Sequence, residues 1–258
     1  MEKLLEKTRR INRLIQHFEK REIDFEKMAR VLSDCIKAKA NVYIINEEGK
    51  ILGHQLITKF KCELMAEQVI KEGQFPIDYN QWLLKNYKML TNYEDREGLC
   101  SFKEERCCFN EKLVTITPIN GGGERLGTLI ISRFDEEFDD SQLLLAEYGA
   151  TVVGMEVLRL RRKKSKKEAR KKTAVNVALG SLSHLELKAV GHVLGKLDGE
   201  EGLLVTSKIA DKMGIARSIV VTGLRKLESA DVIESRSLGM KGTYIKVLNN
   251  KIFSKISA

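Results

Sequence analysis

The sequence is poor in proline and has no long apolar run. Only two of its 258 residues are proline, and no low-complexity tract interrupts the chain. No stretch approaches the roughly 20 apolar residues that cross a membrane. The first residues carry charges every few positions, where a signal peptide would be apolar. We therefore expect a cytoplasmic protein with no membrane partner, long enough for two domains with separate cores.

Cysteine and histidine are also sparse, which argues against most metal and nucleophilic sites. The cysteines are odd in number and lack paired CxxC spacing, which is typical of a reduced, mainly structural set: Cys35, Cys62, Cys100, Cys107 and Cys108. The four histidines show no HExxH or paired ligand spacing, and no Ser–His–Asp or Cys–His set can be assembled. We expect no metal, no catalytic residue and no enzymatic activity. A thiol sensor at the adjacent Cys107 and Cys108 stays open as an alternative.

Charge is distributed unevenly along the chain. Residues 159–172 hold ten Lys or Arg and one Glu, a net charge of +9. Residues 1–158 hold 23 basic and 27 acidic side chains, whereas residues 174–258 hold 12 basic and 8 acidic. This asymmetry indicates a polyanionic partner for the second part, nucleic acid above all. For the basic connector alone, a solvated helix or linker is an equally good interpretation.

The C-terminal residues have the pattern of a helix-turn-helix followed by a wing. Ile209, Ala210 and Met213 share one face of a short helix, and Gly214 suits the left-handed residue that ends it. A second helix is predicted from Ala216, and in this motif the second helix enters the DNA major groove. Strands at 232–238 and 243–248, joined by a glycine-containing turn, predict the wing. A plain helical subdomain ending in a hairpin is the alternative.

The first part of the chain is predicted to be an α+β domain. We expect helices at 4–18, from the N-cap Asp24 onward and near 63–71, with strands at 41–46, 51–53, 112–119 and 125–134. A long helix is expected from 141 to 160, continuing into the basic connector, with these side chains buried: Leu144, Tyr148, Val152, Met155 and Leu158. An antiparallel sheet with helices on its faces is the sensor-like plan of GAF and PAS modules, which leaves a small cavity under the covering loops.

Three further features have two interpretations each. The segment 121–128 is glycine-rich, but it lies between strands and departs from the phosphate-loop pattern, so a hairpin turn is favoured. A carboxylate cluster could bind Mg²⁺, although the start of a helix explains it better: Asp135, Glu136, Glu137, Asp139 and Asp140. Large apolar residues in the irregular region either line a ligand pocket or, as we favour, cap the core: Met65, Phe75, Trp82 and Phe102.

Several blocks of the sequence resemble the CodY family, global nutritional regulators of low-GC Gram-positive bacteria. The resemblance rests on LLEKTRRIN at 4–12, GGGERLGT at 121–128, LAEYGATVVGME at 145–156 and the near-continuous run 202–250, and it is weakest over 54–106. It implies a GAF-like effector-binding domain at 1–155, a basic helical linker at 156–178 and a winged helix-turn-helix at 179–258. It also implies a homodimer, or a tetramer, that mainly represses and binds an AT-rich, near-palindromic operator.

The resemblance further implies the effectors and their site. Isoleucine, valine or leucine would bind around an aromatic–proline pair, matched by Phe75 and Pro76, with backbone groups near Cys100 and Phe102 holding the polar end. GTP is the family's second effector. The family's arginine for the ligand carboxylate is replaced here by Met65. Without that arginine, Lys59, Lys61 or backbone amides would have to offset the free-energy cost of removing the ligand carboxylate from water.

For DNA, the resemblance places the contacts on the second helix and the wing. An arginine on a guanine edge contributes about 1–3 kcal/mol of discrimination, and a lysine on phosphate adds salt-sensitive affinity. The expected contacts are Ser207, Ala216, Arg217, Ser218, Thr222, Arg225, Arg236 and Lys241. We therefore expect a transcriptional regulator whose amino-acid effector biases the dimer toward one arrangement by differential affinity. A GTP-hydrolysing switch and a thiol-sensing DNA-binding regulator are the alternatives.

Overall fold

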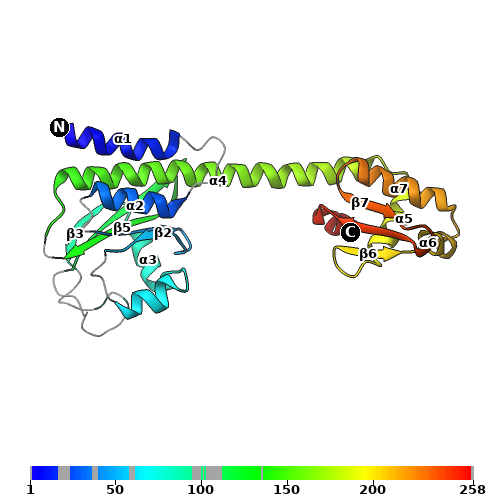
Figure 1. The fold of residues 1–258 in the computed structure, drawn as a ribbon, viewed down its shortest axis with the longest axis horizontal. Helices are drawn as coiled ribbons and strands as arrows, with labels where there is room; N and C mark the ends of the chain where they lie inside the picture. Colours follow the sequence, from blue (N-terminus) through cyan, green and yellow to red (C-terminus); the bar gives the residue numbers. More distant parts are fainter. Residues whose placement is uncertain are drawn as a thin grey trace. The chain divides into compact units, whose positions relative to one another are not determined.

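The structure, a computed structural model, describes residues 2–16, 24–36, 40–57, 62–94, 100, 102, 112–134 and 136–256. The chain divides into two compact units, Met1–Arg161 and Arg162–Ala258. One helix, α4 (Asp140–Gly180), begins in the first unit and ends in the second (Figure 1). Within the described residues, no helix combines the length and the apolar composition needed to cross a membrane.

An antiparallel sheet of five strands forms the centre of the first unit. The strands are β1 (Asn41–Asn46), β2 (Ile51–Gln55), β3 (Leu90–Glu94), β4 (Lys112–Gly121) and β5 (Glu124–Phe134), in the order β2-β1-β5-β4-β3. Ile44 lies opposite Leu129 across β1 and β5, and Ile116 lies opposite Ile130 across β4 and β5. Because both faces are covered, β1 and β5 are buried nearly throughout instead of alternating between buried and exposed residues.

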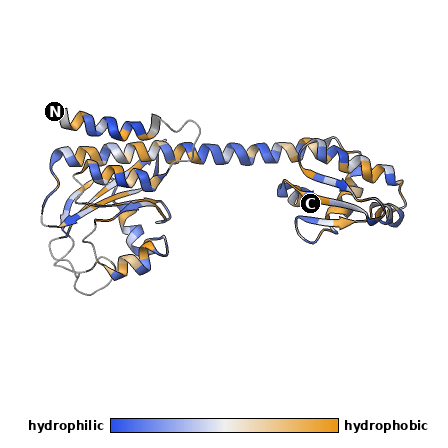
Figure 2. Ribbon diagram, viewed as in Figure 1, coloured by the Kyte–Doolittle hydropathy of each residue, from blue (hydrophilic) through white to orange (hydrophobic). Residues whose placement is uncertain are grey.

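Helices cover one face of this sheet. α1 (Glu2–Gln16), α2 (Phe25–Cys35) and the first part of α4 lie on that side in Figure 1. Figure 2 shows hydrophobic and hydrophilic residues interleaved along these helices, as expected of amphipathic helices. Their apolar residues share one buried core with the sheet, which includes Ile11, Leu32, Ile44, Leu129 and Val153.

A π-helix, η1 (Met65–Ile70), and the helix α3 (Ile77–Lys85) cover the other face. They form a second core with the sheet, which includes Tyr43, Phe75, Ile116 and Ile130. The helical region expected near 63–71 is therefore present, whereas the sequence did not predict α3 or β3. The α+β prediction with helices on both faces of an antiparallel sheet is confirmed.

The prediction of which α4 side chains are buried is wrong at two positions. Val152 is buried, and Tyr148 and Leu158 are half-buried, but Leu144 and Met155 are 52% and 56% exposed. The helix instead buries the neighbouring stripe, in which small residues allow a close approach to the sheet: Leu145, Ala146, Ala150, Val153 and Val157.

In the second unit, the end of α4 packs with α5 (His184–Leu194), α6 (Thr206–Met213) and α7 (Arg217–Ser229). A three-stranded sheet, in the order β6-β8-β7, completes this unit: β6 (Glu201–Leu204), β7 (Ile233–Ser237) and β8 (Thr243–Val247). The 3-10 helix η4 (Asn250–Ile252) and α8 (Phe253–Ile256) follow. Val175 and Ala178 of α4, which fall within the expected linker, are buried in the core of this unit.

The close contact between α4 and the sheet is testable at Gly154. A Cβ added there would lie 2.6 Å from the Asn120 carbonyl oxygen, so Gly154→Ala must displace backbone. We expect it to lower the free energy of unfolding by about 1–3 kcal/mol, although alanine ordinarily favours a helix over glycine. Denaturant unfolding measures the change. Gly180→Ala, on the same helix with nothing within 4 Å of the added Cβ, is the matched control. A Gly154→Ala protein as stable as that control would contradict the packing.

Candidate functional site

An aromatic cluster occupies the second core of the first unit. Phe75 stacks on Tyr79 with ring centroids 5.9 Å apart, and Phe102 meets the edge of Tyr79 at 5.0 Å. Tyr43 contacts Phe75 edge-on at 5.6 Å. Burial raises the pKa of the Tyr43 hydroxyl above its usual range, as expected in an apolar environment. The cluster is a large apolar surface between the sheet, α3 and the segment that precedes α3.

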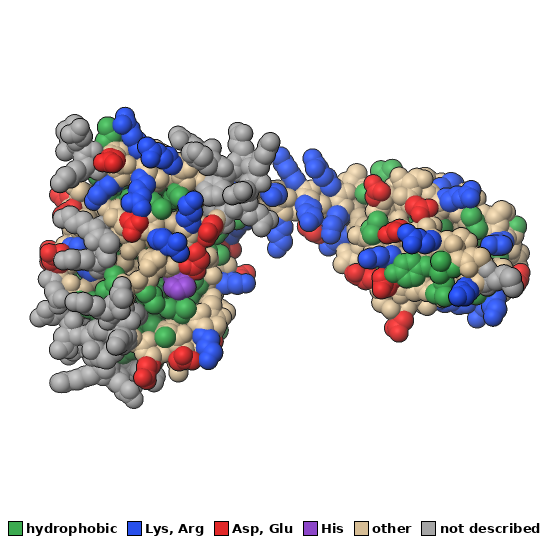
Figure 3. All heavy atoms as spheres, viewed as in Figure 1, with side chains coloured by type: hydrophobic (Ala, Val, Ile, Leu, Met, Phe, Trp, Pro, Cys, Tyr) green, Lys and Arg blue, Asp and Glu red, His purple; other side chains and the backbone are tan. Residues whose placement is uncertain are grey.

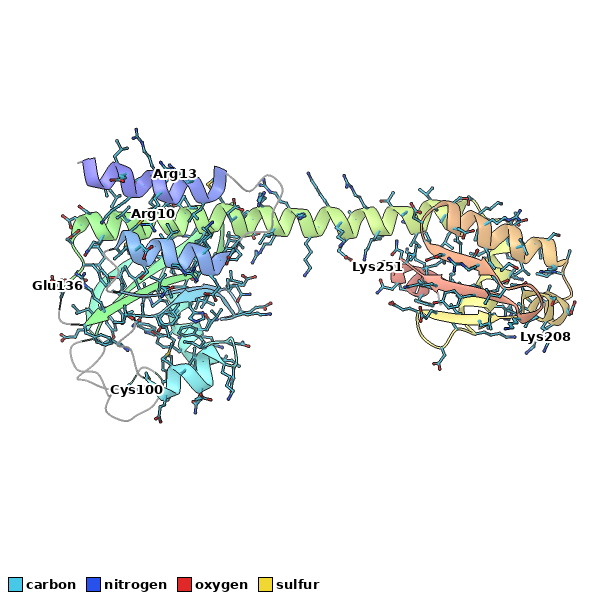
Figure 4. All side chains as sticks on the ribbon, viewed as in Figure 1. Arg10, Arg13, Cys100, Glu136, Lys208 and Lys251 are labelled. Atoms are coloured by element: carbon cyan, nitrogen blue, oxygen red, sulfur yellow. The ribbon has the colours of Figure 1, made fainter. Side chains whose placement is uncertain are left out.

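Three of the five residues expected at the effector site meet in this cluster. Met65 and Phe75 are 6% and 3% exposed, and Phe102 packs against the same core. Pro76 is exposed at the start of α3, where its fixed φ of −53° suits the residue before a helix. Cys100 is half-buried and is labelled in Figure 4. The side chains of Lys59, Lys61, Cys107 and Cys108 lie outside the described residues.

A cation missed by the sequence analysis lies next to this core. The Arg125 guanidinium donates to the carbonyl oxygens of Gly127 at 2.6 Å and Asn86 at 2.7 Å, and to the Thr128 hydroxyl at 2.9 Å. A weaker contact reaches the Leu83 carbonyl at 3.5 Å. Burial lowers the pKa of this guanidinium, which nevertheless stays charged at neutral pH. Arg125 therefore joins β5 to the last turn of α3, where a cation favours the helix dipole.

The glycine-rich segment is a hairpin turn, as favoured from the sequence. Gly121 pairs with Glu124 across β4 and β5. The two residues between them, Gly122 and Gly123, have φ values of 64° and 83°, the left-handed conformation that a two-residue hairpin turn requires. A phosphate loop would lead from a strand into a helix, which this segment does not.

Of the acidic cluster, Asp139 and Asp140 mark the start of α4, and Asp135 lies outside the described residues. The Asp139 carboxylate accepts from the Gln142 backbone N–H at 2.9 Å, and the Gln142 side chain accepts from the Asp139 backbone N–H at 3.0 Å. This reciprocal pair satisfies two amides that the first helical turn leaves unpaired. Among the described residues, no group of three or more His, Cys, Asp or Glu is placed to hold a metal ion.

In the second unit, α6, a tight turn and α7 form the expected helix-turn-helix. Gly214 ends α6 with a φ of 65°, and the Ile215 N–H donates to the Ala210 carbonyl at 3.1 Å. This geometry is the left-handed helix end that glycine adopts at least cost. α7 buries Val220, Leu224 and Leu227 against the core. The helical spacing of apolar residues in the sequence therefore correctly indicates which face of α7 is buried.

The opposite face of α7 is exposed and polar. Ser218, Thr222 and Arg225 follow one another at i, i+4 and i+7, so they share one face of the helix, and all three are exposed. Ala216 and Arg217 are exposed at the start of the helix, and Ser207 is half-buried in the first turn of α6. The structure thus leaves free for contact most of the positions expected to meet DNA.

The wing carries the two other expected contacts. Ser237 pairs with Thr243 across β7 and β8, and the 3-10 turn η3 (Gly239–Lys241) joins these strands. Arg236 is exposed on β7 and Lys241 is exposed in the turn. A third strand, β6, pairs with β8 and was not predicted from the sequence.

Lys226 anchors α7 to the rest of the unit. Its ammonium donates to the Glu186 carboxylate at 2.8 Å and to the Ser181 carbonyl at 2.9 Å. Glu186 also accepts from the Ser183 amide at 2.6 Å, which completes a capping box at the start of α5. Lys226 and this amide lower the pKa of the Glu186 carboxyl. The stabilisation is thus present at neutral pH and is lost as the pH falls through that lowered value.

The sequence contained a signal for part of this arrangement. Ser183 followed three residues later by Glu186 is the signature of a capping box, and it predicts the start of α5. No comparable signal marks Lys226 or Arg125, because their partners on other elements lie 39 or more positions away in the chain.

Comparison with known proteins identifies the family to which the chain belongs. The model of the CodY GAF-like domain matches residues 3–181, and the model of the CodY helix-turn-helix domain matches residues 200–258. The global transcriptional regulator CodY of Clostridium botulinum strain Okra is 50% identical over 256 residues, which cover 99% of this chain and 98% of that protein. Its namesake from Clostridium perfringens strain SM101 is 49% identical over 257 residues, with the same coverage.

A solved structure titled as the cofactor-binding GAF domain of the nutrient sensor CodY from Clostridium difficile is also similar. It is 36% identical, covers 60% of this chain and 97% of its own, and has a TM-score of 0.44. The full-length relatives are named as transcriptional regulators, a non-enzymatic function, which confirms the expectation that this protein is not an enzyme. The chain belongs to the CodY family of global transcriptional regulators and carries the GAF-like and helix-turn-helix domains of that family.

Proposed function

We propose that this protein is a DNA-binding global regulator, mainly a repressor, whose operator affinity rises when its GAF-like domain binds a branched-chain amino acid. Membership of the CodY family and the exposed polar face of α7 carry this proposal. Its place of action is the cytoplasm, its operator is AT-rich and near-palindromic, and GTP is a second effector for which we assign no site.

The proposed DNA contacts divide into two kinds. We expect Thr222 and Arg225, with Ser218 on the same exposed face of α7, to meet base edges in the major groove. Arg217 at the helix start and Lys241 in the wing would neutralise phosphates, together with Arg236. Ser207 and Ala216 lie at the starts of α6 and α7, where backbone N–H groups are available to phosphate oxygens.

The proposed effector site is the aromatic cluster. Met65, Phe75 and Phe102 offer the apolar surface that a leucine, isoleucine or valine side chain requires, beside Pro76 and Cys100. Arg125 is not a substitute for the family's arginine, because its N–H groups already donate to protein acceptors. The ligand carboxylate would therefore be held by backbone amides or by Lys59 or Lys61.

A homodimer fits the near-palindromic operator, since two copies related by a two-fold axis read two half-sites. Leu144 and Met155 leave an apolar stripe exposed on α4, and Leu5 of α1 is 51% exposed. Such residues are the surface that a second copy of the chain would cover. The domain boundaries expected from the sequence, at residues 155 and 178, remain part of this proposal.

Neutralising two of the proposed phosphate contacts tests the DNA-binding half. Each phosphate contact contributes about −0.9 to the slope of log K against log salt concentration. Arg217→Gln with Lys241→Gln should therefore weaken operator binding and make the slope shallower by about 2 per chain. Gel-shift titrations on an AT-rich palindromic duplex at several salt concentrations measure both quantities.

The matched control removes two exposed lysines elsewhere in the same unit, Lys188→Gln with Lys196→Gln. We expect this control to bind the operator nearly as wild type does. Operator binding by Arg217→Gln/Lys241→Gln with an unchanged affinity and salt slope would contradict the proposed interface.

An isoleucine titration tests the effector half. We expect millimolar isoleucine to raise operator affinity, by a factor in the range of about 5 to 150 that is usual for allosteric coupling. Phe102→Ala removes a partly buried ring from the aromatic cluster, so it should abolish this response. Tyr87→Ala, at a position 84% exposed, is the control and should retain the response. If isoleucine leaves operator affinity of the wild-type protein unchanged, the effector assignment is wrong while DNA binding stands.

A further inference from the structure

A pocket in the second unit lies away from the helix-turn-helix. It has a volume of about 430 Å³ and is formed where α4 meets η4 and α8. Val175, which is buried, lies at its apolar side, and Lys172, Lys251 and Lys255 contribute its charged lining together with Glu168. Figure 4 labels Lys251 beside α4 and Lys208 of α6 at the opposite end of the same unit. None of the residues that line the pocket belongs to α6, α7 or the wing, which carry the expected DNA contacts.

The pocket has an excess of positive charge. Glu168 accepts from the Lys251 ammonium at 3.0 Å, and this contact lowers the pKa of the Glu168 carboxyl. One carboxylate balances one of the three lysines, which leaves a net charge of +2 in the lining. Glu168 is also the only acidic residue between 159 and 172, so the neighbouring part of α4 adds further positive charge, and Figure 3 shows Lys and Arg side chains projecting from it.

The chemistry of the lining favours a phosphate group over a carboxylate. Lysine ammonium groups bind phosphate as compact point charges, whereas arginine typically binds a carboxylate through two parallel hydrogen bonds. The lining of this pocket contains lysines and no arginine. Lys172 and Lys255 both line the pocket, and the net charge of the lining matches a phosphate with two negative charges. The volume falls within the range of small-molecule sites and accommodates a diphosphate.

The two lysines come from elements that are already joined at this place. The Asn249 side chain, 5% exposed, donates to the Lys171 backbone carbonyl at 2.8 Å, and the Lys251–Glu168 pair makes a second link. A phosphate that bridges Lys172 of α4 and Lys255 of α8 would add a third link. Binding there would hold the end of α4 on the second unit more firmly.

We propose that this pocket is a binding site for a phosphate group, in which Lys172 and Lys255 are the main ligands. The phosphate could belong to a small phosphorylated molecule or to the backbone of bound DNA, and only the second source rests on the proposed function. The effect of occupancy is to stabilise the junction between α4 and the DNA-binding unit.

The test compares three full-length proteins: wild type, Lys172→Gln/Lys255→Gln and the charge-matched control Lys188→Gln/Lys196→Gln. Inorganic pyrophosphate is the probe for the small-molecule source. It should raise the thermal unfolding midpoint of the wild type and the control by several degrees and saturate, because a ligand that binds only the folded state stabilises it. The pocket variant should lose this shift while keeping a normal midpoint without pyrophosphate.

Operator binding against salt concentration is the probe for the DNA source. If DNA phosphate occupies the pocket, the slope of log K should become shallower by about 1–2 in the pocket variant and stay unchanged in the control. If only the pocket variant loses the pyrophosphate-induced rise in the unfolding midpoint, the site is supported and its ligand is a small phosphorylated molecule. If only the pocket variant has a shallower slope of log K against salt, the site is supported and its ligand is DNA phosphate. Equal behaviour of the pocket variant and the control in both arms overturns it. If none of the three proteins binds DNA, the proposed function is wrong, and the pyrophosphate titration still tests the phosphate site.

Discussion

The packing of one face of α7 against the core, together with the contact of Lys226 with Glu186 and Ser181, sets which face of this helix is exposed. α7 projects its polar face outward because its opposite face is buried through Val220, Leu224 and Leu227, and the Lys226 ammonium adds a polar link to the start of α5 and to the residue after α4. The pair is partly shielded from solvent, since the Glu186 side chain is 10% exposed and the Lys226 side chain 37%. Removing the ammonium would leave the Glu186 carboxylate, the better shielded partner, without its cation. The exposed positions of Ser218, Thr222 and Arg225 depend on this constraint.

The helix α4 contributes to the cores of both units. Leu145 and Val153 pack on the sheet of the first unit, whereas Val175 and Ala178 are buried in the second. Between these ends, residues 162–167 are exposed and consist of cations around Ser165. α4 is therefore a covalent and helical connection between the first unit, where we propose that the effector binds, and the second. The phosphate site proposed beside Lys172 lies at the end of this connection, where binding would affect how firmly α4 is held.

The sequence predicted local features well and long-range contacts poorly. The helix-turn-helix could be predicted because its signals are local: apolar residues at helical spacing and Gly214, whose φ is 65°. The hairpin at Gly122 and Gly123 was predicted for the same reason. By contrast, Leu144 and Met155 were placed in the core because periodicity alone cannot tell which of two adjacent apolar stripes meets the sheet. Arg125 was missed because its acceptors come from α3 as well as from its own strand. The roles of Met65 and Cys100 rest on family resemblance and stay predictions.

The measurement that tests this account most directly is the operator affinity of Lys226→Met, taken together with its thermal unfolding midpoint. Methionine keeps the length and apolar stem of the side chain and removes the ammonium that bonds Glu186 and Ser181. Lys196→Met, at an exposed position on the same unit, controls for the lost charge. The account predicts that Lys226→Met stays folded at assay temperature with a lowered midpoint, and that its operator affinity falls at least about tenfold, or ~1.4 kcal/mol, below that of the control. A folded Lys226→Met protein that binds the operator as tightly as the control would contradict it.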